Sequence, residues 1–288
     1  MHSRIFFLYL TPMSTPLNIF QLAADNFESL SKQFETFKKN VDSRELELAL
    51  NFLEENLVFS INFKATKLAP FLETFQYKNA YELYETEKER KNHFSGRKNQ
   101  RKGFDGSFEN GKKFKYAALN CGTIGLRKWG VYCLHFDLDK YAKERKCVII
   151  KRNSLQKDTI KGVEKFYYFE EDAQTVNIGK LINDLSPKNQ VKELICIKIG
   201  KLDLTVDGFK ELLCNSEDTE YMELIFLDGN LKSYVNLAYI WMERAKLTGL
   251  NIIKKHKNKK IKIKAEIENA NVLKQLKAAN IELKFVEG

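Results

Sequence analysis

The segment from Gly111 to Leu138, GKKFKYAALNCGTIGLRKWGVYCLHFDL, constrains the fold more than any other part of the chain. Two interleaved sets of residues alternate along the chain on each side of a turn that contains glycine. One set consists of Phe114, Tyr116 and Ala118 before the turn and of Val131, Cys133 and His135 after it. A period of two residues is typical of a β-strand. The segment therefore predicts two strands joined by a cationic turn, with aromatic rings among lysines, which suits a flat anionic ligand.

The composition allows a sizeable core and favours anionic partners. The chain has 288 residues, 43% of them hydrophobic, and a formal net charge of +10. Such an excess of Lys and Arg favours nucleic acid, a nucleotide, an acidic protein surface or a membrane surface. The alternative is a lysine-rich surface that only keeps the protein in solution.

Cysteine and histidine usage gives no support for a disulfide framework or a metal site. The five cysteines are an odd number and have no C-x-x-C spacing, and there are four histidines. A reducing compartment fits this pattern best, so we expect a cytoplasmic protein. The apolar run Ile5–Leu10 is too short to span a bilayer, and Met13 is an alternative start to Met1.

The N-terminal third predicts helices followed by a strand and a basic loop. Residues 18–41 and a segment that begins at Asp42 show apolar spacing of three and four residues, which predicts a helical hairpin. Residues 57–63 alternate like a strand, and residues 76–91 look helical. Residues 88–115 carry ten Lys or Arg and four glycines, which predicts a long surface loop that binds a ligand or is simply solvated.

The second half alternates between strand and helix patterns. We expect strands at 147–151, 165–169, 195–199, 223–227, 252–253, 261–268 and 281–286, and helices at 209–213, 234–247 and 270–278. The basic residues between Lys254 and Lys264 form a second cluster, which contacts phosphate or an acidic surface, or is solvated.

These elements predict an α+β fold: an N-terminal helical hairpin, a mixed and mostly antiparallel sheet, and a C-terminal segment rich in βαβ pattern. The expected division is a leader and hairpin at 1–56, a core at 57–240 and an α/β segment at 241–288. A boundary near residue 177 is the alternative.

Common catalytic motifs are missing from the sequence. It contains no G-x-x-x-x-G-K-[ST], no G-x-G-x-x-G, no G-x-S-x-G and no H-E-x-x-H. This disfavours a P-loop NTPase, an α/β-hydrolase and a zinc enzyme of these types.

The segment 113–134, KFKYAALNCGTIGLRKWGVYCL, resembles a bacterial domain-of-unknown-function family whose members carry R-P-K-Y-G-A-L-N followed by a turn and R-F-G-S-C-H-L. This family is placed among ADP-ribosyltransferase-like folds. Looser similarities cover 57–240: FLET at 71–74, ERKNHFSG at 89–96, and YME at 221–223, which looks like the family's Y-[IV]-E-A-Q.

The resemblance implies an NAD-dependent mono-ADP-ribosyltransferase that modifies a macromolecule, as a bacterial toxin, as a defence protein, or as an effector secreted into a host cell. NAD is then a substrate, and no metal is expected. Glu223 would stabilise the oxocarbenium-like transition state. The expected NAD-binding residues are cations for the diphosphate, rings that stack, and one amide: Lys67, Lys113, Lys115, Arg127; Tyr116, Trp129, Tyr132; and Asn120.

The sequence departs from the family's pattern at three of its characteristic positions. The usual arginine and serine would fall near Ala69 and at Val131, and Lys113 replaces the arginine of R-P-K-Y. Lysine lacks the bidentate fork of arginine. An inactive relative stays open, as does a non-catalytic basic module that grips nucleic acid or an acidic protein, through Arg97, Lys98, Arg101 and Lys102.

Overall fold

The computed structural model describes residues 16–84, 86, 98–155, 157–160, 163–166, 168–170, 173–176, 181, 183–200, 204–214, 221–241 and 259–286. Within them lies an eight-stranded sheet of order β12-β11-β3-β1-β2-β10-β4-β9. Its neighbouring strands are antiparallel, except that β11 and β12 run parallel. The α+β class with a mostly antiparallel sheet is thus confirmed.

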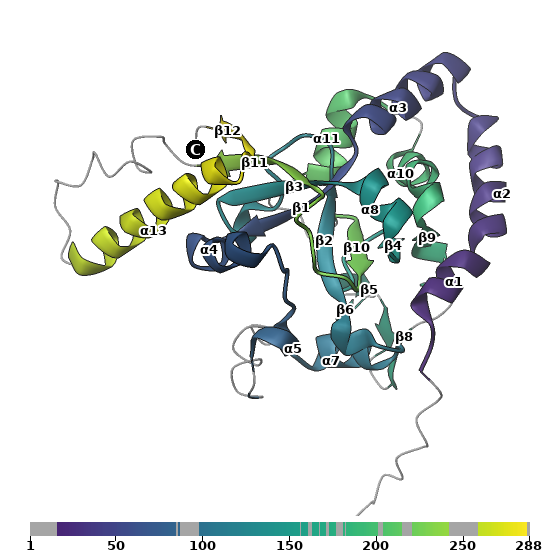
Figure 1. The fold of residues 1–288 in the computed structure, drawn as a ribbon. Coiled ribbons are helices and arrows are strands. Elements are labelled where there is room, and N and C mark those ends of the chain that lie inside the picture. Colours follow the sequence, from purple (N-terminus) through teal and green to yellow (C-terminus); the bar gives the residue numbers. More distant parts are fainter. Residues whose placement is uncertain are drawn as a thin grey trace, which may run out of the picture.

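The strands of this sheet come from the whole length of the chain (Figure 1). They are β1 (Val58–Phe63), β2 (Lys115–Asn120), β3 (Tyr132–Asp137), β4 (Cys147–Ile150), β9 (Leu185–Pro187), β10 (Glu223–Phe226), β11 (Val235–Trp241) and β12 (Glu282–Val286). Two small hairpins lie apart from it: β5 (Lys157–Ile160) with β6 (Val163–Phe166), and β7 (Phe169–Glu170) with β8 (Ala173–Val176).

Three helices open the described part of the chain: α1 (Ile19–Asp25), α2 (Phe27–Lys38) and α3 (Ser43–Asn56). The side chains of Asn18 and Asp42 accept backbone N–H groups at the starts of α1 and α3, which fixes where these helices begin. Helices α2 and α3 both contact α10 (Val191–Ile199), so the expected N-terminal helices are present and cover one side of the molecule (Figure 1).

Shorter helices fill the connections: α4 (Ala65–Thr74), α5 (Ala80–Leu83), α7 (Lys98–Gly106), α8 (Leu138–Glu144) and α11 (Val206–Cys214), with 3-10 turns η1 (Gly111–Lys113), η2 (Arg127–Trp129) and η3 (Lys188–Gln190). The long helix α13 (Lys259–Ala278) crosses from β11 to the parallel β12. This βαβ unit at the C-terminus agrees with the expectation, and it extends the same sheet. The described helices include none that is long and apolar enough to cross a membrane.

The two faces of the sheet differ because alternate residues point to opposite sides. One face is apolar: Phe59, Leu119, Phe136 and Phe226 are fully buried in the largest hydrophobic cluster. The rings of Phe59 and Phe136 stack with their centroids 5.0 Å apart, under helices that include α4 and α8. We call this side the apolar face.

The opposite side carries buried polar groups at its centre, and we call it the polar face. Its polar residues are Ser60, Asn62, Tyr116, Asn120, His135 and Glu223. A second apolar cluster from α1, α7 and β4 covers one end of this face, where Phe104, Val148 and Ile225 are buried.

The two strands predicted on either side of the cationic turn exist at 115–120 and 132–137, although β1 lies between them in the sheet. Several other sequence predictions were wrong. Where it is described, the expected basic loop contains α7, whose Phe104 is fully buried. Residues 195–199 are helical, because Val191, Leu194 and Ile195 pack into the apolar core at helical spacing.

Two further errors concern the C-terminal part. Residues 235–241 form β11 instead of a helix, and residues 261–268 belong to α13 instead of a strand. In β11, Ala238 and Ile240 are fully buried on one face while Leu237 and Tyr239 are half-buried on the other. Four predicted segments lie wholly or partly outside the described residues, and the predictions for their undescribed parts stay predictions. These segments are 76–91, 234–247, 252–253 and 254–264. The predicted domain division stays a prediction.

Candidate active site

Glu223 lies next to the tyrosine segment that the sequence analysis singled out. Strand β10 pairs with β2, and Glu223 stands opposite Ala118. Because residues two apart on a strand share a face, Glu223 lies on the same side of the sheet as Tyr116 and Asn120. A gap of more than one hundred residues in sequence is therefore closed by one pair of neighbouring strands.

The Glu223 carboxylate is buried and held by hydrogen bonds. Its exposed fraction is 2%. One oxygen accepts the backbone N–H of Ser154 at 2.9 Å, and the other accepts the Tyr221 hydroxyl at 3.4 Å. Burial raises the pKa of Glu223, whereas the positive charge of Arg101 lowers it.

Arg101 brings a buried positive charge to this carboxylate from α7. Only 8% of its side chain surface is exposed. Its guanidinium lies 3.9 Å from the centre of the Tyr116 ring, and Nη1 is 3.7 Å from Oδ1 of Asp105. Among the described residues, that Nη1 has an ion-pair partner in Asp105 but no partner within hydrogen-bond distance.

Asp105 completes the cluster from the next turn of α7. Its carboxylate accepts hydrogen bonds from the hydroxyls of Tyr116 and Tyr81. Burial raises the pKa of Asp105, and Arg101 opposes this rise. The cluster thus combines two buried carboxylates, one arginine and three tyrosine hydroxyls, which we call the Glu223 cluster: Tyr81, Arg101, Asp105, Tyr116, Ser154, Tyr221 and Glu223.

A second polar network covers the middle of the polar face and ties the loop 121–130 to the sheet. Asn120 donates to Ser60 Oγ at 3.0 Å and to the Thr123 carbonyl at 3.1 Å, and His135 Nε2 lies 2.7 Å from that carbonyl. Burial lowers the pKa of His135 to about 4, so its ring is neutral at pH 7. Asn120, a predicted NAD ligand, therefore already has several partners within the protein.

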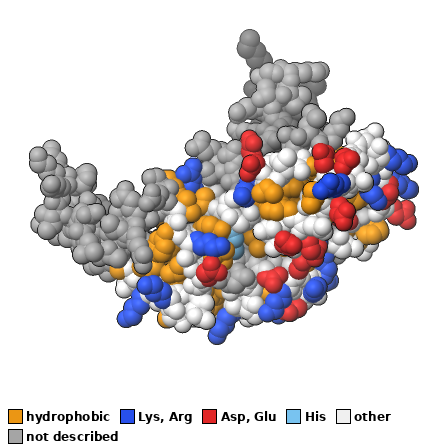
Figure 2. Space-filling view, turned by 90° about the horizontal axis from the view of Figure 1, so that it is seen from above, with side chains coloured by type: hydrophobic (Ala, Val, Ile, Leu, Met, Phe, Trp, Pro, Cys, Tyr) orange, Lys and Arg blue, Asp and Glu red, His pale blue; other side chains and the backbone are white. Residues whose placement is uncertain are grey.

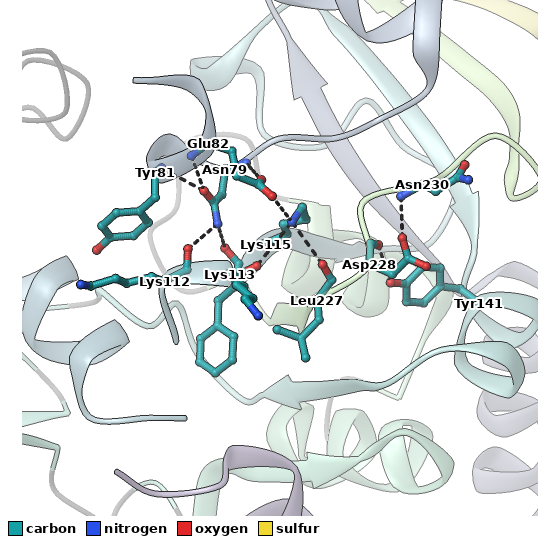
Figure 3. Close-up of polar contacts among 11 residues, drawn as sticks. Asn79, Tyr81, Glu82, Lys112, Lys113, Lys115, Tyr141, Leu227, Asp228 and Asn230 are labelled. Atoms are coloured by element: carbon teal, nitrogen blue, oxygen red, sulfur yellow. Dashed lines mark hydrogen bonds and ion pairs between the residues drawn. The ribbon is translucent and has the colours of Figure 1, made fainter. Parts of the chain in front are cut away.

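The lysines predicted to hold the diphosphate lie elsewhere. Lys115 is 3% exposed on the apolar face, and its Nζ contacts Glu82 Oε1 at 3.1 Å and the Leu227 carbonyl at 3.1 Å (Figure 3). Lys113 is exposed and lies in the turn before β2, where Asn79 donates to the neighbouring carbonyls of Lys112 and Phe114. Lys67 is exposed on α4 and donates to the Tyr84 hydroxyl at 3.1 Å.

Figure 3 shows the Lys115 ammonium group between the Glu82 carboxylate and two main-chain carbonyls, those of Leu227 and Lys113. These contacts join the start of β2, the end of β10 and α5. The lysine therefore stabilises this corner of the fold, and no part of its side chain reaches the Glu223 side of the sheet.

The remaining predicted residues divide between the core and the loop. Tyr132 is fully buried, and its hydroxyl donates to Asn269 of α13 at 2.7 Å, away from Glu223. Arg127 and Trp129 lie in η2, where Trp129 is 53% exposed. Of the nine predicted site residues, the sheet thus brings Glu223, Tyr116 and Asn120 to one face.

Sequence reasoning missed the contribution of α7. Arg101 was read as one of several surface cations, and Asp105 as part of the same loop. The signal that could have revealed them is the four-residue spacing of Arg101 and Asp105, together with Phe104 and Phe108, in a stretch that the glycines made look irregular. No group of three or more His, Cys, Asp or Glu suited to a metal ion gathers among the described residues.

Comparison with known proteins adds no assignment: no family model matches the chain, and no curated protein matches it.

Proposed function

We propose that the protein is an NAD-dependent ADP-ribosyltransferase that modifies a macromolecule. The observation that carries the proposal is the position of Glu223 beside Tyr116, with Arg101 stacked on that tyrosine. The family resemblance of the two segments and their adjacency in space are independent of each other. Their agreement favours a transferase over a chance match of short motifs.

The chemistry asks for one carboxylate at the ribose. The bond between ribose C1′ and nicotinamide breaks, nicotinamide leaves with the bonding electrons, and the acceptor's nucleophile forms the new bond to C1′ and loses its proton. Glu223 would stabilise the positive charge that develops on the ribose. The ionised form is needed for this. Burial raises the pKa of the carboxyl group, and Arg101 favours the ionised form by opposing that rise.

Arg101 would take the place of the arginine that is missing near Ala69. Its Nη1 has no hydrogen bond among the described residues and interacts electrostatically with Glu223, and a guanidinium is a better phosphate ligand than Lys113. The proposal also requires movement, because Glu223 is 2% exposed and NAD reaches it only if covering side chains shift.

The test is release of nicotinamide from NAD by the purified full-length chain, alone and with cell extract as a source of acceptors. We expect turnover in the wild type and a loss of at least about 100-fold in Glu223→Gln, which keeps the shape and removes the charge. Tyr132→Phe is the matched control, because it alters a predicted NAD residue that lies away from Glu223.

Equal nicotinamide release by the wild type and Glu223→Gln, or none by the wild type with both acceptor conditions, would overturn the proposal. A transferase whose Tyr132→Phe variant lost activity like Glu223→Gln would move the site to the other side of the sheet.

A further inference from the structure

The loop 121–130 presents an exposed tryptophan and two cations from a fixed backbone. Asn62 donates to the carbonyls of Ile124 at 3.0 Å and Gly130 at 3.1 Å, and its Oδ1 accepts the Leu126 N–H at 2.9 Å. A Cβ at Gly130 would lie 2.0 Å from the Phe63 backbone, so only glycine allows this close approach. The loop is thus built against β1.

The turn η2 at the outer side of this loop is rich in basic and aromatic side chains. Trp129 is 53% exposed, and Lys128 Nζ lies 5.9 Å from its ring. Arg127 stacks over Trp241 at 4.6 Å. Tyr239 donates to the Gly122 carbonyl at 2.7 Å and has Lys284 over its ring at 5.7 Å. We call this the loop surface: Arg127, Lys128, Trp129, Tyr239, Trp241 and Lys284.

Exposure of an indole ring on a pinned turn favours a partner with flat faces. A loop backbone that is already held in place loses little conformational entropy on binding. Figure 2 shows one face of the molecule, on which basic side chains are interspersed with acidic and hydrophobic ones and do not form one block. At η2 itself, an exposed ring stands beside Lys128, which suits stacking aided by a few cations.

We propose that the loop surface binds single-stranded nucleic acid, with a base stacked on Trp129 and phosphates held by Lys128 and its neighbouring cations. Exposed aromatic rings beside Lys and Arg are the means by which proteins hold unpaired strands. A duplex hides the faces of its bases and would lose the stacking part of the affinity. This binding does not depend on NAD cleavage.

The loop surface adjoins the Glu223 cluster. Lys128 Nζ lies 5.7 Å from the ring of Tyr221, whose hydroxyl bonds to Glu223. If the proposed function holds, a bound strand lies beside the reacting ribose and is a candidate acceptor. This placement differs from the sequence-based expectations, which gave nucleic-acid contacts to residues 97–102 and assigned Arg127 and Trp129 to NAD.

The test uses the intrinsic fluorescence of the chain's 2 tryptophans and the anisotropy of a dye-labelled 12-nucleotide single strand of mixed sequence, without NAD. We expect tryptophan quenching on binding. Trp129→Ala should weaken binding roughly 5- to 100-fold, the loss of one stacked base. Trp129→Phe should bind within about 3-fold of wild type, since a ring remains, but should lose most of the quenching.

Lys128→Ala should lower the salt dependence of the affinity by about one unit of the log–log slope. Phe27→Ala and Lys32→Ala are matched controls, because Phe27 is 44% exposed and the Lys32 side chain 82% exposed on α2. Both should bind like the wild type.

The inference is overturned if the wild type binds no strand, if Trp129→Ala and Lys128→Ala bind as the wild type does, or if a duplex of the same length or an acidic peptide binds as tightly. Nicotinamide release is scored separately, so loss of either activity leaves the other result intact.

Discussion

The two faces of the central sheet use the same strands for different purposes. On β2, Ala117 and Leu119 enter the apolar core, whereas Tyr116 and Asn120 lie among polar partners. Both faces are buried, and burial alone stabilises the apolar face and the end of the polar face where Val148 and Ile225 lie. The polar face must satisfy each buried group, and a side chain kept there at such a cost is a candidate for function.

The largest effect on stability is expected from Phe59→Ala on the apolar face. Phe59 is fully buried and contacts the rings of Phe136, Tyr141 and Phe226. We expect the free energy of unfolding to fall by about 4 kcal/mol, measured by urea denaturation. The exposed Phe27→Ala should change it by less than about 0.5 kcal/mol. A loss below about 1 kcal/mol for Phe59→Ala would show that the packing is wrong.

On the polar face, Arg101→Met should lower the free energy of unfolding by about 3 kcal/mol at pH 7, because Asp105 and Glu223 lose their buried counter-charge. Without the arginine, the pKa of each carboxyl rises further, so protonation relieves the loss. The deficit relative to wild type should therefore shrink as the pH falls from 7 to 5. A deficit that stays constant with pH would contradict the charge coupling.

His135 should make the wild-type protein less stable as the pH falls, whereas acidification should reduce the stability deficit of Arg101→Met. Its pKa is about 4 in the folded state against 6.5 for the unperturbed group, so the unfolded chain binds the proton first. Acidification from pH 7 to pH 5 should cost about 2 kcal/mol through this residue, by linkage. His135→Gln should lack that part of the pH dependence in parallel denaturation series, and identical slopes for both proteins would refute a buried neutral histidine.

Asn62→Ala should have the smallest effect on global stability, about 1 to 2 kcal/mol, because it removes three hydrogen bonds to the loop. A more specific effect of this substitution is expected in the loop itself. Hydrogen exchange of the Leu126 amide should become faster relative to the amides of β1. Unchanged protection of Leu126 would mean that the loop is held by other contacts.

The sequence predicted the parts of the fold in which local pattern and tertiary packing agree. In β1 the alternation of residue types predicted the strand, and in β10 a short apolar run did so; both patterns agree with the observed burial. In α10, the alternation of Ile195, Ile197 and Ile199 is typical of a strand. The segment is nevertheless a helix, which places Leu194 and Ile195 in the core. In β11, Leu237, Ile240 and Trp241 fit a helical spacing, although pairing with β3 and β12 decides the structure.

The candidate site was predictable only in part. The motif around Tyr116 and the later Glu223 were visible, and their pairing in the sheet is a non-local outcome that a resemblance could suggest. Arg101 was not predictable from charge alone, since a buried arginine and an exposed one look alike in sequence. The burial of Lys115 was not predictable either, because its partners, Glu82 and the Leu227 carbonyl, come from distant segments.

The most direct measurement is a calorimetric titration of the full chain with a non-hydrolysable NAD analogue. If the polar face holds the dinucleotide, the wild type and Lys115→Met should both release or absorb heat with similar affinity, whereas Tyr116→Leu should bind at least about 10-fold more weakly through loss of ring contacts. Flat traces for a folded wild type, or a loss caused by Lys115→Met and not by Tyr116→Leu, would contradict the account.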